Sequence, residues 1–161
     1  NYYHESLSIQ EKIKDKDGIA TSLNNIGSIY GDQGDLNKSL EYYNRGLEMR
    51  ISMGNKKDIA NSYNNIGSVY RNLKQYDKAL EMSMNSILLQ KEIDDKQGLA
   101  LSYLNLGKIH SYNGDLQKAS EYLKKSLRIR EGLGDKKNIA KSKLYLSLFI
   151  LTPYFKIVFF V

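Results

Sequence analysis

The sequence YNNIGSVY at residues 63–70 recurs along the chain at a constant spacing. LNNIGSIY occupies residues 23–30 and YLNLGKIH occupies residues 103–110, so each copy begins 40 residues after the previous one. A second set of blocks keeps the same spacing: GDLNKSLEYY begins at residue 34, KQYDKALEMS at 74 and GDLQKASEYL at 114. A fixed period of this length is typical of a solenoid, in which each unit buries its apolar face only against its neighbours.

Each unit is predicted to form a hairpin of two α-helices, the first over about residues 19–31 and the second over about 36–53. Both segments place apolar residues at spacings of three and four, which is the pattern of an amphipathic helix. Gly34 allows a tight turn between them, and Asp35 can cap the second helix. The sequence therefore predicts an all-α array of hairpins.

These blocks resemble the repeats of the tetratricopeptide repeat family, and the 40-residue period is similar to that of kinesin light chain and of bacterial peptide-sensing regulators. The chain departs from the family pattern at Lys74, where Gly is usual, and at His110, where Tyr is usual. The resemblance implies a right-handed superhelical solenoid of antiparallel helix hairpins. Residues that match the family signature are expected to have structural roles, and they include Gly27, Gly67, Gly107, Ala79 and Ala119.

The repeat register divides the chain into an array over residues 1–150 and an apolar tail over 151–161. Because the chain opens inside a second helix, we expect it to be a piece of a longer protein. The predicted units are a partial repeat over 1–17, full repeats over 18–57, 58–97 and 98–137, and the first helix of a fourth repeat over 138–150.

Two adjacent asparagines, Asn64 and Asn65, lie in the interior of a predicted helix. Asn is unfavourable there because its side chain competes for backbone hydrogen bonds. Neighbouring residues point about 100° apart around a helix, so the two side chains serve different purposes. Asn65 recurs as Asn25 and Asn105 beside the packed face. We expect this row to be structural and to hydrogen-bond the backbone at the junctions between helices.

Asn64 belongs instead to a stripe that, by the family resemblance, lines the concave groove. An Asn amide offers a donor and an acceptor, which suits an extended peptide backbone. The alternative is that these are short polar side chains on a solvated face. Lys and Arg on the stripe match only partly the carboxylate clamps of chaperone-binding repeats, and its leucines favour an apolar ligand side chain. The candidate groove residues are Asn24, Ser28, Asn61, Asn64, Ser68, Arg71, Leu101, Leu104 and Lys108.

The residue chemistry predicts no enzyme, no cofactor and no bound metal. The chain contains no Cys and only two His. It shows no nucleophile elbow, phosphate-binding loop, dinucleotide fingerprint or metal-ligand cluster. The net charge of +6 is local, since residues 117–143 contain nine Lys or Arg against three Asp or Glu. Without a recognition motif around it, this basic stretch is interpreted as a solvated helix face, and no nucleic-acid partner is expected.

The C-terminal sequence LYLSLFILTPYFKIVFFV, residues 144–161, is apolar and has three interpretations. It is a terminal unit that covers the last hairpin or mates with another copy, a membrane segment, or sequence that does not belong to the repeats. A spanning helix needs about 20 apolar residues, and this segment is shorter and includes Pro153 and Lys156. Solenoids need polar end caps for solubility, so an apolar end predicts self-association.

A solenoid presents a long concave surface, so the predicted function is a non-catalytic scaffold that binds a protein or peptide ligand. The alternative is a sensory or regulatory input region of a larger bacterial signalling protein, such as a histidine kinase or a transcriptional regulator. Cytoplasmic localisation is expected because no signal peptide is visible and the chain lacks cysteine.

Overall fold

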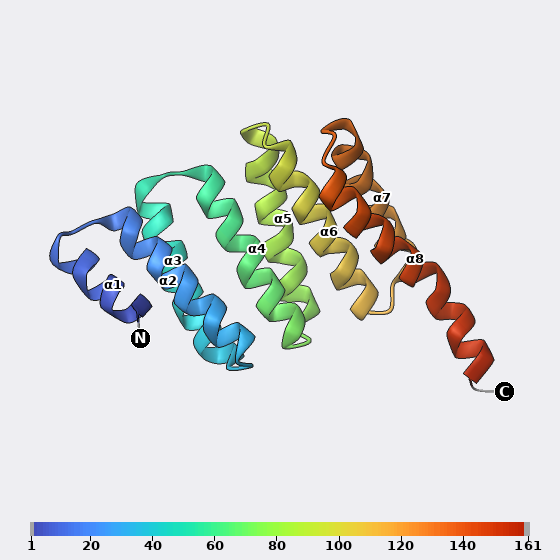
Figure 1. Cartoon of the computed structure of the whole chain (residues 1–161), viewed down its shortest axis with the longest axis horizontal. Coiled ribbons are helices and arrows are strands. Elements are labelled where there is room, and N and C mark those ends of the chain that lie inside the picture. The colour runs from blue at the N-terminus through green and yellow to red at the C-terminus, as the bar shows by residue number, and fades with distance from the viewer. Residues whose placement is uncertain (1, 160–161) are drawn as a thin grey trace.

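The computed structural model describes the backbone of residues 2–159 and the side chains of residues 2–147. Within this part of the chain all regular structure is helical, in eight helices, which confirms the predicted all-α class. Figure 1 shows the helices side by side as successive hairpins, with α1 and α8 at opposite ends of the solenoid. The helices are α1 (Tyr2–Lys12), α2 (Lys16–Asp32), α3 (Leu36–Met53), α4 (Lys56–Asn72), α5 (Tyr76–Glu92), α6 (Lys96–Tyr112), α7 (Leu116–Gly132) and α8 (Lys136–Phe159).

Side-chain caps begin most of these helices. The Asp35 carboxylate accepts a hydrogen bond of 3.1 Å from the backbone N–H of Lys38, so α3 starts where the sequence predicts. Asp15 accepts a bond of 3.1 Å from the N–H of Gly18 in the same way. This cap starts α2 at Lys16, three residues before the predicted start.

Left-handed residues end the helices at the turns. Gly34 and Gly54 have φ values of +82° and +77°, which glycine adopts without steric cost. Lys74 occupies the register of Gly34 and takes a φ of +59°. The turn geometry is therefore kept at the position where the sequence departs from the family pattern, although a non-glycine residue is sterically disfavoured there.

The helices form two layers. The first helices of the hairpins are α2, α4, α6 and α8, and each packs against a second helix on either side or, for α8, against α7. In addition, α4 packs directly against α6, whereas no comparable packing joins α5 to α7 among the described residues. At this junction the first helices are thus closer together than the second helices, which places α4 and α6 on the inner side of the curve.

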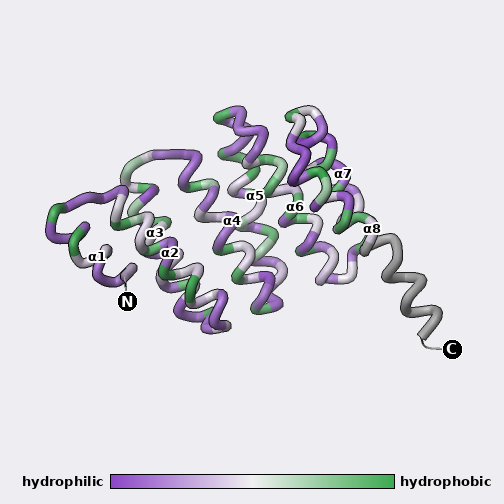
Figure 2. Tube along the Cα trace, in the orientation of Figure 1, coloured by the Kyte–Doolittle hydropathy of each residue, from purple (hydrophilic) through white to green (hydrophobic). Residues whose placement is uncertain are grey.

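The hydrophobic core runs between the layers and across the repeat junctions. Ile26 and Leu23 form one cluster with Leu7 of α1. Ile66 and Tyr43 form the next cluster, which joins α4 to the preceding hairpin. Figure 2 shows that hydrophobic and hydrophilic residues alternate along each helix of the array. Each repeat therefore completes the core of its neighbour, as a period of this length predicts.

The last helix spans the predicted division between array and tail. The backbone of α8 continues from Lys136 to Phe159, past the expected end of the array at residue 150. The predictions that residues 151–161 form a cap, an interface or a membrane segment concern side chains outside those that the structure describes. No helix in the described part of the chain is long and apolar enough to cross a membrane.

Candidate peptide-binding groove

Asparagine side chains join neighbouring first helices. Asn65 Nδ2 donates a hydrogen bond of 2.8 Å to Asn24 Oδ1. One repeat later, Asn105 Nδ2 donates a bond of 3.4 Å to Asn64 Oδ1. This row bonds the side-chain amide of the preceding repeat, and the expectation that it bonds the backbone is wrong for both residues. Each of these two amides therefore links its own helix to the preceding first helix through a side-chain contact.

The structure also corrects the placement of Asn64 and Leu104, which were expected to line the groove. Each side chain is only 3% exposed. Asn64 Nδ2 donates to Ser102 Oγ at 2.8 Å, inside the contact between α4 and α6. Direct packing of these two helices covers positions that would be exposed on an isolated hairpin. Asn64 and Leu104 are therefore interior residues and are not available to a ligand.

Ser102 is the centre of a buried network that sequence analysis missed. Its hydroxyl donates to Gln90 Oε1 at 2.7 Å and lies 3.1 Å from Ser86 Oγ. Ser86 in turn donates to the carbonyl of Ala60 at 2.8 Å. Together with Asn64, these contacts connect α4, α5 and α6 through polar groups that are shielded from water.

The same junction recurs with an alternating partner. Ser22 pairs with Gln10, Ser62 with Arg50 and Ser142 with Arg130, at distances of 2.6–2.7 Å. Where the partner is Arg, its Nη1 also donates to a backbone carbonyl, that of Asp58 or of Asn138. Where the partner is Gln, the position equivalent to Asp58 and Asn138 is a glycine, Gly18 or Gly98. In each repeat the first helix contains Ile-Ala or Leu-Ala, and a serine follows two residues later. This recurring pattern could have revealed the row of buried serines.

The remaining groove candidates lie on the accessible surface. Asn24, Asn61 and Ser68 are half-buried, and Leu101 is 41% exposed. Ser28 is exposed. Burial raises the pKa of Tyr43, and the Ser28 side chain opposes this shift. Asn24 uses Oδ1 to accept from Asn65, while the described residues offer its Nδ2 no partner. This stripe therefore retains hydrogen-bond donors for a ligand.

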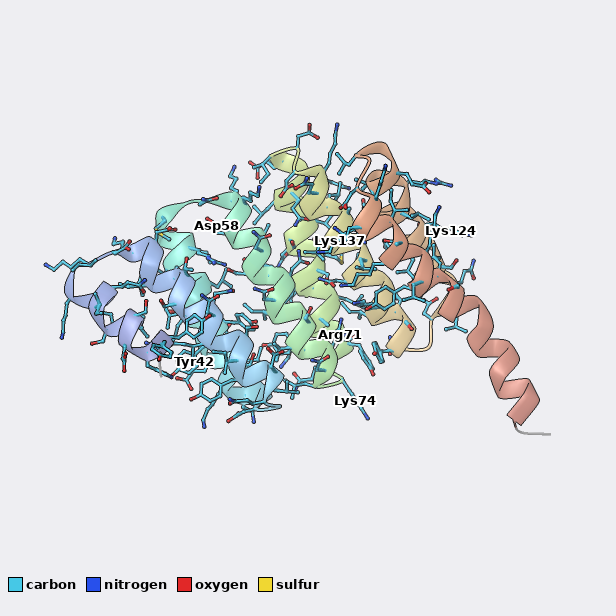
Figure 3. The ribbon with its side chains drawn as sticks, viewed as in Figure 1. Tyr42, Asp58, Arg71, Lys74, Lys124 and Lys137 are labelled. Carbon is cyan, nitrogen blue, oxygen red and sulfur yellow. The ribbon has the colours of Figure 1, made fainter. Side chains whose placement is uncertain are left out.

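The two cationic groove candidates, Arg71 and Lys108, each lie over the ring of a tyrosine from the following repeat. The Arg71 guanidinium carbon lies 5.8 Å from the centre of the Tyr112 ring, and Lys108 Nζ lies 4.3 Å from the centre of the Tyr145 ring. Figure 3 shows Arg71 near the end of α4. Burial lowers the pKa of Arg71, although the nearby tyrosines oppose this shift. Within the described side chains neither cation has a carboxylate within ion-pair distance. Sequence analysis did not identify the two tyrosines.

Lys108 controls the acidity of Tyr145. A hydrogen bond from Lys108 is the main reason that the pKa of Tyr145 lies below its ordinary value, while partial burial opposes the shift. We expect Lys108→Met to raise the Tyr145 pKa, measured by NMR titration of tyrosine labelled with ¹³C at the ring. Lys124→Met, a change at an exposed position of α7, is the matched control. An unchanged Tyr145 titration in Lys108→Met would show that α6 and α8 do not meet here.

Fold and site together define a class of protein: an α-solenoid of helix hairpins whose inner side carries polar and cationic side chains. The sequence profile of the tetratricopeptide repeat family matches residues 1–52 and 58–132, and the chain belongs to this family. A comparison with curated proteins finds no significant match. Tetratricopeptide repeats are generally non-catalytic and mediate protein interactions, so the chain is a protein-interaction scaffold by fold.

Solved structures share this fold. A Rap protein complexed with Competence and Sporulation Factor superimposes with a TM-score of 0.85 at 18% identity, covering 97% of this chain and 44% of that chain. BtubC from P. vanneervenii gives 0.79 at 20% identity, covering 91% and 62%. A putative kinesin light chain repeat protein from Podosopora anserina gives 0.64 at 13% identity, covering 94% and 85%. The chain thus spans less than two thirds of the first two proteins.

Proposed function

We propose that the chain binds an extended segment of a partner protein along the inner side of α2, α4 and α6. The observation that carries this proposal is the pair of cations, Arg71 and Lys108, held on a half-buried surface without a carboxylate partner among the described residues. A partly desolvated cation gains most from a carboxylate that a ligand supplies. The groove therefore favours a peptide with an acidic side chain or a free C-terminus at this end.

The rest of the stripe supplies contacts that do not depend on the ligand sequence. Asn24 Nδ2 and the amide of Asn61 can donate to peptide carbonyls. Leu101 gives an apolar surface one helix further along. In such a groove, hydrogen bonds hold the backbone of the peptide, and a few side-chain contacts give the selectivity. Other proteins that bind extended peptides use the same combination.

The second candidate function places this groove in a larger signalling protein, as an input region whose ligand controls an output domain. The observation that favours it is the similarity to the Rap protein, of which the chain spans 44%. A protein of that kind contains further segments on which a bound ligand can act. The sequence of the complete parent protein tests this candidate directly: a kinase or DNA-binding domain in the same polypeptide supports it.

The groove is tested by panning a random dodecapeptide phage library against the chain and measuring the selected peptides by fluorescence anisotropy. We expect acidic peptides to be selected, and we expect Arg71→Ala and Lys108→Ala each to weaken binding about tenfold, equivalent to one lost charge-assisted hydrogen bond of roughly 1.4 kcal/mol. Lys124→Ala makes the same charge change on the outer layer and should alter the dissociation constant less than twofold.

Two outcomes would contradict the proposal. The first is selection of peptides that bind Arg71→Ala and Lys108→Ala as tightly as the unmodified chain. The second is a groove that selects no peptide above background. Asn24→Ala adds a further check, because loss of its free amide should weaken every selected peptide by a similar factor if the contact is to the backbone.

A further inference from the structure

A pocket of 460 Å³ opens on the opposite layer, between α5 and α7 and over α6. Ile87 and Leu106 provide apolar surface within it. On one side the Tyr122 ring stacks between Tyr103 and His110, with ring centres 6.0 Å and 5.4 Å away. Binding pockets for compact ligands fall in the range of roughly 300–1,000 Å³, so this one is large enough for a bulky side chain.

The apolar edge of the pocket is specific to this repeat. Met84 and Leu88 line it and lie one turn apart on α5, where they are 58% and 65% exposed. The same register holds Asn44 and Glu48 in α3, and Lys124 and Arg128 in α7. The fold therefore accepts polar residues at these positions, and packing of the solenoid does not require the apolar pair.

The charge around the pocket is positive. Lys91, Lys118 and Lys125 line it, and none of the described lining residues is acidic. Two of these lysines form ion pairs with acids of α7 and its cap, but Lys91 has no acidic partner among the described residues. Burial lowers the pKa of His110, so the stacked ring adds no charge near neutral pH.

A second pocket between repeats shows that an apolar lining surrounded by positive charge is not a general property of the array. It lies between α1 and α3 and has the same volume of 460 Å³. Glu11, Arg45 and Glu48 line it, so its charges are mixed and mainly acidic. Of these two pockets, only the α5–α7 pocket combines apolar residues with cationic residues and has no acidic residue in its described lining.

We propose that the α5–α7 pocket is a second docking site, which takes a bulky apolar or aromatic side chain from an acidic segment of a partner protein. The stacked rings give a flat, rigid surface for such a side chain. Lys91 would pair with a carboxylate beside it, and Lys118 and Lys125 add positive charge although each also pairs with an acid of this chain, which gives the electrostatic complementarity of a specific contact. This site is on the other layer from the proposed groove and does not depend on it.

Charge argues against the apolar end of a second copy as the occupant. Residues 148–161 contain Lys156 and no Asp or Glu, so they offer the lysines no counter-charge. The experiment below still distinguishes a second copy from a partner protein. If a second copy fills the pocket, concentrating the protein without peptide will shift the NMR signal of Met84.

Methionine methyl NMR tests the site directly. The chain has four methionines, of which Met84 lines the pocket and Met82 packs into the core. The probe is the blocked hexapeptide Glu-Glu-Leu-Phe-Glu-Glu, added to the full chain with ¹³C-labelled methionine methyl groups. We expect a saturable shift of the Met84 signal, with Met49, Met53 and Met82 unchanged. The peptides Lys-Lys-Leu-Phe-Lys-Lys and Glu-Glu-Gly-Gly-Glu-Glu should give no such shift.

Leu88→Glu is the variant that should abolish binding, because Glu48 already occupies this register in α3 and the fold accepts it. We expect at least a tenfold weaker peptide affinity with an unchanged circular dichroism spectrum. Ile51→Glu is the matched control, since Ile51 is 52% exposed on α3 and lines neither pocket. Arg71→Ala should leave the Met84 response intact, which separates this site from the groove.

Several results would overturn the proposal. One is a Met84 signal that does not shift when the acidic peptide is added. Others are equal binding of the basic and acidic peptides, and an unchanged peptide affinity in Leu88→Glu. A Met84 shift that appears on concentrating the protein without peptide would assign the pocket to a second copy. Binding of decanoate but not of the peptide would assign it to a small anionic amphiphile.

Discussion

Ser102→Ala should lower the free energy of unfolding by about 2–4 kcal/mol, because each buried polar group left without a partner costs about 1–3 kcal/mol. The Ser102 hydroxyl is fully buried and contacts Asn64, Gln90 and Ser86 within 3.1 Å. Alanine fills almost the same space but leaves the Asn64 amide and the Gln90 carbonyl without their shared partner. Urea denaturation followed by circular dichroism measures the loss.

Ser22→Ala is the matched control, at the same register two repeats earlier. Ser22 donates to Gln10 at 2.6 Å, and Gln10 is only half-buried, so water can replace the lost partner. The expected loss there is about 1 kcal/mol or less. Similar losses at both positions would contradict the idea that Ser102 holds a network. A double-mutant cycle with Asn64→Ala should show strong coupling, since both residues act through one hydrogen bond.

Gly107→Ala should also destabilise the array, by about 1–2 kcal/mol, although alanine in a helix is intrinsically favoured by about 1 kcal/mol over glycine. A Cβ at this position would lie 2.7 Å from Leu123 Cγ and 3.2 Å from the backbone oxygen of Ala119. The backbone oxygen cannot rotate away, so the two helices of the hairpin would have to separate. Thermal and urea denaturation both report this change.

The controls for Gly107 follow from the space around other glycines. A Cβ on Gly132 meets no atom within 4 Å, so Gly132→Ala should be neutral or stabilising by up to about 1 kcal/mol. Gly67 is intermediate, with its nearest contacts at 3.3 Å. A loss of stability that follows this order would identify close helix approach as the cause. A stabilised Gly107→Ala variant would show that the hairpin can widen without cost.

Local chemistry and the 40-residue period were sufficient to predict the helices. Asp35 and Gly34 mark a cap and a turn whatever surrounds them, because their effects act within one turn of the backbone. The period adds that each unit packs on the next, which predicts the solenoid before any contact is known. The division between array and tail at residue 150 stays a prediction, because it depends on side chains outside those that the structure describes, while the helical backbone of α8 continues past it.

The groove was predicted less well, since the sequence alone does not show how closely adjacent repeats approach. Asn24 and Asn64 occupy the same register. Asn24 is half-buried and its Nδ2 has no partner among the described residues, whereas Asn64 is buried between two helices. The difference depends on the direct contact of α4 with α6. Leu104 was misplaced for the same reason, and Tyr145 was missed because it reaches Lys108 from the next repeat.

The amino-acid sequence by itself determined the class, the repeat, the helix caps and the turns, because these depend on interactions between residues close together in the chain. Tertiary structure alone decided which polar side chains are interior and which face a ligand. It also placed Met84 and Leu88 beside three lysines at a single junction. The physical reason is that a side chain becomes buried only when another helix packs against it. In this array that helix comes from a neighbouring repeat, about 40 residues away in the sequence.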